Sequence, residues 1–168
     1  FDKTGTLTVG EPRVIGVVTA DGVEESDLLR LAASVESRSE HPLAQAIVTA
    51  ARERGVGFSE CSAFMSEAGF GARGRVDGQF VQVGSRTLME RERVREFHSP
   101  PPSAGTSTVD GQTLVHVARE HHWLGVLTLA DDLKPEARAV IAELRERLGC
   151  RVVMLTGDQR PVAERIAG

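Results

Sequence analysis

The sequence contains few aromatic residues and few cysteines. Phe and Trp together make up 4% of its 168 residues, and Tyr is absent. Leu, Val, Ile and Ala must therefore build the core. The two cysteines, Cys61 and Cys150, lie far apart, and neither has a second cysteine at metal-ligand spacing. This pattern favours two reduced thiols, as in a cytosolic protein, over a zinc site.

The sequence also lacks long apolar runs, a signal peptide and an excess of positive charge. No apolar run approaches the ~20 residues that cross a bilayer, and no signal-peptide pattern is present. The formal net charge of −4 argues against a general nucleic-acid-binding protein, which is usually basic. With 40% hydrophobic and 26% charged residues, the composition is that of a soluble globular protein of one domain or two small ones.

An initiator methionine is missing, and the two ends of the sequence interrupt recognisable patterns. Residues 1–8 read FDKTGTLT, so a carboxylate follows the first residue with no strand before it. The last residues, TGDQRPVAERIAG, stop inside a pattern that indicates a helix. We therefore expect this chain to be a fragment of a longer protein.

The first half of the sequence predicts a strand followed by two helices. Residues 14–18 (VIGVV) indicate a short strand, and Ser26 is expected to cap the first helix. The second helix is expected to start near Ser39, with Pro42 in its first turn, and to stop at Gly55.

The middle of the sequence predicts antiparallel strands. Residues 76–83 indicate a hairpin on the two-residue turn Asp77-Gly78. Two further strands are expected at 113–118 and 123–129, joined by a turn around Glu120-His121-His122. We interpret the adjacent histidines as an exposed turn and not as a metal site, because neighbouring residues on a turn rarely converge on one ion.

The last part of the sequence has the character of an α/β domain. LADDLKPEA leads into an expected helix with Pro135 in its first turn and Gly149 at its end. The apolar run RVVML at 151–155 is typical of a strand buried on both faces. It runs into Thr156-Gly157-Asp158 and another expected helix, and ligands bind at such strand ends. The sequence thus predicts an α/β domain into which the middle region is inserted.

Asp2 lies in a turn rich in Gly and Thr, a setting that suits phosphoryl transfer. A carboxylate can attack phosphorus and form an aspartyl phosphate. Lys3 adds positive charge nearby, and backbone amides around Gly5 can face phosphate oxygens. An isolated Asp-Lys-Thr-Gly would indicate only a surface turn, but the whole of FDKTGTLT is longer and chemically more unusual.

The stretch DKTGTLT at 2–8 resembles the phosphorylation motif of P-type ATPases, the ion pumps that pass through an aspartyl phosphate. The resemblance implies that Asp2 is the nucleophile, with Lys3 beside it, and that Asp2 and the Thr4 carbonyl hold Mg²⁺. Thr156-Gly157-Asp158 resembles the family's TGD motif, in which the Thr holds the phosphoryl group and the Asp lies near the nucleotide and magnesium. Asp131 with Lys134-Pro135 resembles a further stretch of the same domain.

SEHPLA at 39–44 is similar to the His-Pro motif of the heavy-metal-transporting branch of this family. A lone His-Pro would indicate only a helix start. In this context the resemblance implies an ATP site, with His41 against the adenine and Glu36 as a second nucleotide-binding residue.

GFGARG at 69–74 fits the pattern G-x-G-x-x-G, but strand, turn and strand follow it where a dinucleotide site needs a helix. We therefore reject the dinucleotide interpretation. The resemblance to the metal pumps offers another, in which Gly69 and Gly71 let the backbone pass close to the nucleotide. Gly84-Ser85-Arg86 matches a further contact stretch, which implies roles for Gly84 and Arg86, although the family commonly has Asn in place of the Ser.

The resemblance spans residues 1–168 and implies an α/β fold. A partial haloacid-dehalogenase-like (Rossmann-like) phosphorylation domain is expected at 1–11 and 127–168, with an inserted α+β nucleotide-binding domain on an antiparallel sheet at 12–126. The implied cofactors are ATP and Mg²⁺, and no nucleic-acid partner is expected. The transported heavy-metal ion would bind membrane helices outside this sequence. The chain would be a cytoplasmic portion of an integral membrane protein, in a prokaryotic plasma membrane.

Two other functions stay open at this point. The first is a soluble phosphatase of the haloacid dehalogenase superfamily, which would share the Asp nucleophile. The second is a nucleotide-binding module without catalysis, because the family's later GDGxNDxP stretch and the catalytic Lys before it are not in this sequence. The fragment is therefore expected to be catalytically incomplete.

Overall fold

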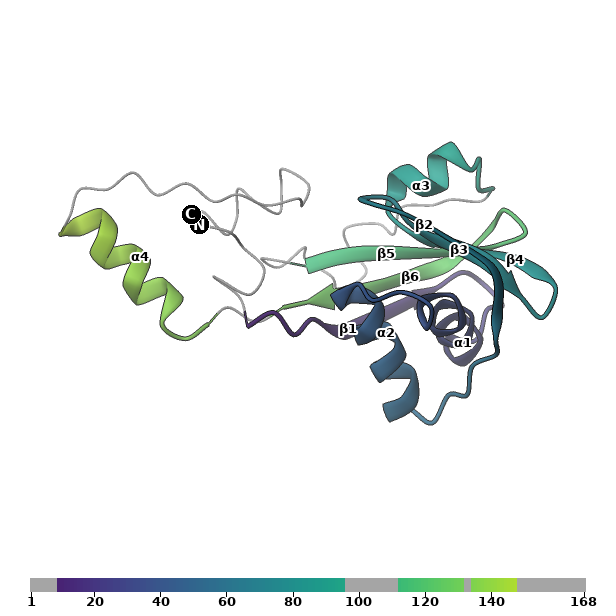
Figure 1. Ribbon diagram of the computed structural model, residues 1–168, viewed down its shortest axis with the longest axis horizontal. Helices are drawn as coiled ribbons and strands as arrows, with labels where there is room; N and C mark the ends of the chain where they lie inside the picture. Colours follow the sequence, from purple (N-terminus) through teal and green to yellow (C-terminus); the bar gives the residue numbers. More distant parts are fainter. Residues whose placement is uncertain (1–8, 96–111, 132–133, 148–168) are drawn as a thin grey trace.

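The computed structural model describes residues 9–95, 112–131 and 134–147 (Figure 1). The elements in chain order are β1 (Arg13–Thr19), α1 (Glu25–Glu36), α2 (Pro42–Glu53), β2 (Cys61–Glu67), β3 (Gly71–Val76), β4 (Gln79–Gly84), α3 (Arg86–Arg91), β5 (Gln112–Arg119), β6 (His122–Ala130) and α4 (Ala137–Glu146).

The strands form one six-stranded sheet in the order β1-β6-β5-β4-β3-β2. Each neighbouring pair is antiparallel, as the sequence predicts for its middle region. The other strands pair with their neighbours in sequence, but β1 pairs with β6, the last strand, with Arg13 opposite Ala130. The chain therefore enters and leaves this sheet at the same place.

A carboxylate ties the two chain crossings together at that place. The Oδ1 atom of Asp131 accepts hydrogen bonds from the backbone N–H groups of Gly10, at 3.1 Å, and Glu11, at 3.2 Å. Gly10 has a φ of 86°, which glycine adopts without steric strain. The residues just before β1 and just after β6 are thus held to each other by side chain as well as by the strand ladder.

Both predicted hairpins are confirmed. Asp77 and Gly78 have φ values of 51° and 79°, and Glu120 and His121 have values of 49° and 62°. Two successive positive φ values belong to the type I′ turns that match strand twist. The second turn has no glycine, and contacts with Phe80 hold it, because the Phe80 N–H donates to the Glu120 carboxylate at 2.6 Å and the Glu120 N–H donates to the Phe80 carbonyl at 2.8 Å.

The helices differ in detail from the sequence prediction. α2 has Pro42 in its first turn, as expected. The cap of α1 is Glu24 and not Ser26, which lies inside the first turn, so that prediction was wrong. Pro135 precedes α4, whose cap is Glu136, so its placement in the first turn was also wrong. A residue with fixed φ suits a position just before a helix as well as the first turn.

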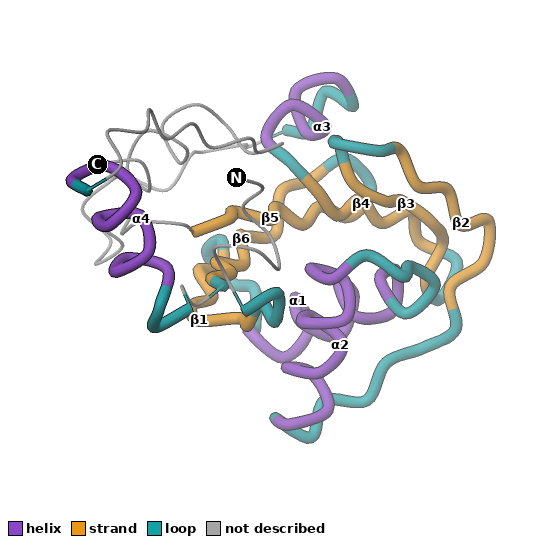
Figure 2. The backbone as a smooth tube through the Cα atoms, turned by 60° about the vertical axis from the view of Figure 1, so that its left-hand side comes forward, coloured by secondary structure: helices purple, strands orange, loops and turns teal. Residues whose placement is uncertain are grey.

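The core lies between the sheet and the helices α1 and α2, which cover one of its faces (Figure 2). Fully buried side chains from the helices meet fully buried side chains from the strands, and they are Leu28, Leu29, Leu31, Ile47, Val76, Val81, Val83, Val117 and Leu127. A second, smaller cluster joins Leu88 and Met89 of α3 to Ala118. The core is aliphatic, as the shortage of aromatic residues predicts.

We expect Leu28→Ala to lower the free energy of unfolding by about 2 to 5 kcal/mol, because it leaves a cavity in the core. Ile15→Ala is the control, because the Ile15 side chain in β1 is 54% exposed, and its loss should be below about 1 kcal/mol. Urea unfolding followed by the fluorescence of Trp123, the one Trp of the chain, measures both. Equal losses would contradict the assignment of the core to the α1 face.

Candidate functional site

The residues predicted for phosphoryl transfer lie outside the described residues. This holds for Asp2, Lys3, Thr4, Thr156 and Asp158. Among the three described segments, no group of His, Cys, Asp and Glu side chains could hold a metal ion. The residues predicted for nucleotide binding are all described, and they fall into two groups, the connection between α1 and α2 and the ends of β3 and β4.

α1 crosses the sheet from β6 toward the strands that carry the glycines. At its start, Leu28 packs at the position of Gly125 in β6, and Asp27 pairs with Arg119 of β5. Further along, Arg30 donates to Asp77 in the β3–β4 turn at 2.7 Å. Ser34 then accepts from the N–H of Ser59, just before β2, at 3.0 Å.

Glu36 is the last residue of α1, a helix that packs against β3 and β4. Gly69 lies in the turn between β2 and β3, and Gly71 is the first residue of β3. Within the described part of the chain, no hydrogen bond joins Glu36 or His41 to these glycines.

Glu36 is buried to an unusual degree for a carboxylic acid, with 7% of its surface exposed. In the described segments its carboxyl group has no hydrogen-bond or ion-pair partner. Burial raises its pKa from an ordinary 4.5 to about 7, because the charged form loses its hydration. The last turn of α1 has no basic residue, and the negative end of the helix dipole also disfavours an anion there.

His41 is exposed and caps α2. Its Nδ1 atom accepts from the N–H of Leu43 at 3.2 Å, which assigns the remaining ring proton to Nε2 when the ring is neutral. The Ser39 hydroxyl accepts from the His41 N–H at 3.3 Å, and Gln45 donates to the Ser39 carbonyl at 2.8 Å. The ring is thus fixed at the helix start with its Nε2 edge turned outward. His41 therefore has a structural role whatever else it binds.

Gly71 and Gly84 lie opposite each other in the β3–β4 ladder. A Cβ atom on Gly71 would lie 2.2 Å from the Val83 carbonyl oxygen, and one on Gly84 would lie 2.2 Å from the Phe70 carbonyl oxygen. These two positions therefore require glycine because two backbones touch, a reason that the sequence alone does not give.

Gly69 differs from the other two glycines. It has a φ of +79°, and no atom lies within 4 Å of where its Cβ would be. Of the three glycines predicted to approach a nucleotide, this is the one with open space beside its backbone. It is therefore the glycine best placed for close approach of a ligand.

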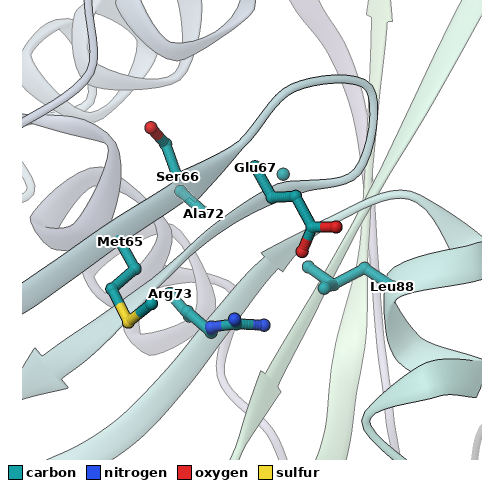
Figure 3. Close-up of a pocket in the computed structure, with 7 residues that line it drawn as sticks. Met65, Ser66, Glu67, Ala72, Arg73 and Leu88 are labelled. Carbon is teal, nitrogen blue, oxygen red and sulfur yellow. The ribbon is translucent and has the colours of Figure 1, made fainter.

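Next to Gly71, a hollow of about 160 Å³ opens between the β2–β3 hairpin and α3 (Figure 3). It is lined by Met65, Ser66, Glu67, Gly71, Ala72, Arg73 and Leu88. Ligand pockets for small molecules usually hold about 300–1,000 Å³. The hollow is therefore too small for a whole nucleotide.

Ion pairs to α3 occupy the polar groups at this hollow. Glu67 pairs with Arg91 at 2.8 Å, and Arg73 pairs with Glu92 at 2.6 Å. These pairs hold α3 to the edge of the sheet, and their charges are already balanced by one another. The hollow thus belongs to the packing of α3 and does not enlarge the candidate site.

Arg86 begins α3 directly after Gly84, and its side chain pairs with Glu90 at 2.7 Å. His116 lies opposite Gly84 in β5 and is 2% exposed. Burial, and then the charge of Arg86, lower the pKa of His116 to about 4. Sequence reasoning missed His116 as a neighbour of this group. The alternation of residues along β5 indicates which face of the sheet His116 lies on. Only the register of β4 against β5 shows that it lies opposite Gly84.

Comparison with known proteins identifies the family. A model of haloacid dehalogenase-like hydrolases matches residues 1–168, and the chain belongs to that family. The predicted α/β, haloacid-dehalogenase-like fold class is thereby confirmed. In the part of the chain that the structure describes, no helix has the length and apolarity to cross a membrane.

The relatives are metal-transporting P-type ATPases, which confirms the resemblance seen in the sequence. The chain is 40% identical over 167 residues to a probable copper-exporting P-type ATPase V of Mycobacterium tuberculosis, covering 99% of this chain and 22% of the relative. It is 36% identical over 166 residues to a silver exporting P-type ATPase of Salmonella typhimurium, covering 99% and 20%. The chain thus spans about a fifth of the length of these relatives.

Solved structures give the same result. A zinc-transporting PIB-type ATPase in the E2.Pi state matches with a TM-score of 0.66 and 39% identity, covering 99% of this chain and 26% of that one. The N-domain of HMA8, a copper-transporting P-type ATPase, matches with a TM-score of 0.56 and 33% identity, covering 70% of this chain and 98% of that one.

We expect Gly71→Ala to destabilise the sheet by several times the ~1 kcal/mol that a positive φ alone imposes on a non-glycine residue. The added Cβ would collide with the Val83 carbonyl, which is part of the β4 backbone and cannot rotate away. Gly57→Ala is the matched control, because nothing lies within 4 Å of its Cβ position. Thermal unfolding of both variants checks this, and similar melting temperatures would contradict it.

Glu36 should make stability depend on pH. Its pKa is about 7 in the folded state and about 4.5 when exposed, so the folded state retains a proton that the unfolded state releases. The contribution of Glu36 to stability therefore falls as pH rises from 4.5 to 7, by up to about 3 kcal/mol. The stability of Glu36→Gln relative to the parent should rise by this amount across the range, whereas Glu40→Gln, on the exposed connection, should follow the parent. Urea unfolding across this range measures the difference between the variants.

The pKa of His116 acts with the opposite sign. Its folded value of about 4 lies below an ordinary 6.5, so the unfolded state takes up the proton first and stability falls as pH drops from 6.5 to 4. In Glu36→Gln this acid-side loss should remain alone. If Glu36→Gln still lost stability as the pH rose from 5 to 7, this would contradict the burial of a neutral Glu36.

Proposed function

We propose that this chain is the ATP-binding and phosphorylation region of a heavy-metal-transporting P-type ATPase. The observation that carries the proposal is the α1–α2 connection, where a buried, unpartnered Glu36 stands five positions before an exposed, oriented His41. A buried acid without a partner and an exposed imidazole, close in the sequence, are groups that can bind a flat heterocycle with polar edges. The metal-transporting relatives, which align along 99% of the chain, support the same function.

In the proposed reaction, the adenine lies near Glu36, His41 and Gly69, and the triphosphate extends toward Asp2. A carboxylate oxygen of Asp2 bonds to the γ-phosphorus while the bond to the bridging oxygen breaks, which leaves ADP. Lys3 and Thr156 stabilise the phosphoryl oxygens, and Asp158 lies near the nucleotide.

Gly71 and Gly84 let β3 and β4 approach each other beside the nucleotide site, and Arg86 lies at the start of α3 next to them. Magnesium, when bound, neutralises charge on the phosphate oxygens, and Asp2 and Thr4 would hold it.

We propose that residues 12–126 form the nucleotide-binding domain, inserted between 1–11 and 127–168 of a phosphorylation domain. The single sheet that begins at Arg13 supports this division, as does the separate N-domain of HMA8 that matches 70% of the chain. β6 continues to Ala130, where it pairs with Arg13 of β1, so we propose that the second crossing follows Ala130, four residues beyond 126.

The whole protein would couple hydrolysis of the aspartyl phosphate to movement of a heavy-metal ion. The ion would bind membrane segments beyond this chain, which would itself lie on the cytoplasmic side of a prokaryotic plasma membrane. The metal-transporting relatives favour this proposal over a soluble phosphatase. A module that binds nucleotide without phosphorylating Asp2 is the alternative for the chain in isolation.

We expect ATP to bind this chain more tightly than GTP by at least about tenfold, a difference of about 1.4 kcal/mol. His41→Asn should weaken ATP binding, because Asn preserves a helix cap but removes the ring. His122→Asn, at the exposed start of β6, is the matched control and should bind as the parent does. Isothermal calorimetry of the three proteins with both nucleotides measures this.

Two results decide between the proposals. Absence of nucleotide binding by a folded sample would contradict the ATP site and favour the phosphatase. Transfer of the γ-phosphate of ATP to the chain, lost in Asp2→Asn, would exclude a module that only binds. Binding without transfer would place the chain as a nucleotide-binding part that depends on the remainder of the phosphorylation domain.

A further inference from the structure

The turn that carries Gly69 lies at the edge of the sheet. β2 is the last strand in the sheet order, and Glu67 at its end lies opposite Gly71 of β3. Gly69 is the middle residue of the turn between them, which closes because the Phe70 N–H donates to the Glu67 carbonyl at 3.0 Å. A glycine has access to many backbone conformations. The shape of this turn therefore depends on the contacts made by the residues on either side of Gly69.

Phe70, which follows Gly69, is fixed to the end of β4 and to α3. Its carbonyl accepts from the Ser85 N–H, just after β4, at 2.7 Å. Its side chain packs against the small cluster that joins Leu88 and Met89 of α3 to the sheet. These contacts locate the end of the turn that leads into β3.

Arg91, in the last turn of α3, contacts both ends of the turn at once. Its guanidinium carbon lies 4.5 Å from the centre of the Phe70 ring, close enough for a cation to be attracted to an aromatic face. Its Nη1 atom donates to the Glu67 carboxylate at 2.8 Å. Figure 3 shows the Glu67 side chain extending from β2 toward Leu88 of α3. Arg91 thus bridges Glu67 and Phe70 across the turn that contains Gly69.

A second ion pair attaches α3 to the sheet but does not reach this turn. Arg73 of β3 donates to the carboxylate of Glu92, the residue after Arg91, at 2.6 Å. In the described segments neither Arg73 nor Glu92 makes a hydrogen bond or an ion pair with residues 67–70. The side chains of this pair are 25% and 24% exposed, against 49% for Arg91 and 38% for Glu67. Two arginines therefore attach α3, but Arg91 is the one that also contacts the turn.

We propose that Arg91 is a positioning residue for the nucleotide, and that it holds the Gly69 turn in the conformation that leaves the Gly69 backbone open to ATP. This rests on the proposed function and adds a role for α3 in it. A turn that is ordered before ATP arrives loses less conformational entropy on binding, so affinity rises without a contact between Arg91 and the ligand. Solvated ion pairs contribute little to global stability, so the fold should survive the loss of Arg91.

The test measures ATP affinity by calorimetry in the parent chain, Arg91→Gln, Glu67→Gln, the double variant and the control Arg73→Gln. Arg91→Gln and Glu67→Gln should each bind ATP about three- to tenfold more weakly than the parent. The double variant should bind as Arg91→Gln does, because the two residues act through one contact. Arg73→Gln removes the other, more buried attachment of α3 and should bind as the parent does.

The sign of the Glu67→Gln effect separates positioning from direct attraction. If Arg91 attracted the triphosphate by its own charge, loss of the Glu67 carboxylate would leave that charge unbalanced and strengthen ATP binding. Tighter binding by Glu67→Gln would therefore overturn the inference. Equal losses of affinity in Arg91→Gln and Arg73→Gln would also overturn it, because they would show that only the attachment of α3 matters.

A second measurement needs no nucleotide. The backbone order parameter of Gly69, from ¹⁵N relaxation, should fall from about 0.85 in the parent toward about 0.6 in Arg91→Gln, and it should stay unchanged in Arg73→Gln. An unchanged order parameter in folded Arg91→Gln would overturn the inference, and ATP binding by the parent would still uphold the proposed function. Failure of every protein, the parent included, to bind ATP would overturn the proposed function and this inference together.

Discussion

The burial of one face of a six-stranded antiparallel sheet under two helices is the constraint on which the rest of the structure depends. Because that face is aliphatic, α1 and α2 must lie across it with their apolar sides inward. The charged contacts of Asp27 and Arg30 then set the direction of α1 over the strands. The packing of the two helices on the core therefore fixes the position of the α1–α2 connection, which carries the candidate site.

The candidate site illustrates how structural and functional roles coincide in the same residues. His41 ends the connection as a helix cap, and the same hydrogen bond fixes the ring that it presents. Gly71 and Gly84 bring two strands into backbone contact. Of these three glycines, Gly69 is the one with open space beside its backbone. Glu36 is buried by packing, which raises the pKa of its carboxyl group. Each feature that suits a nucleotide is thus maintained by the fold even without one.

The sequence predicted the parts of the fold that depend on local chemistry. The hairpin at Asp77-Gly78 and the helix with Pro42 in its first turn follow from backbone preferences of those residues. β2 was missed because it is an edge strand whose ladder is interrupted at Ala63, with a φ of 49°, so its exposed side chains do not alternate cleanly. α3 was missed because it is six residues long and charged. The burial of Glu36 and the contact of Gly71 with Gly84 depend on strand register, which sequence patterns do not specify.

The pairing of β1 with β6 has a consequence for the modularity of the protein. Arg13 and Ala130 are neighbours across one strand spacing, about 5 Å, and Asp131 holds the chain on both sides of that point. A segment whose two ends meet in this way can be cut from its host or grafted into another loop without stretching either. The sheet is therefore a separable unit whose two connections to the rest of the chain lie side by side, held together by the β1–β6 ladder and by Asp131.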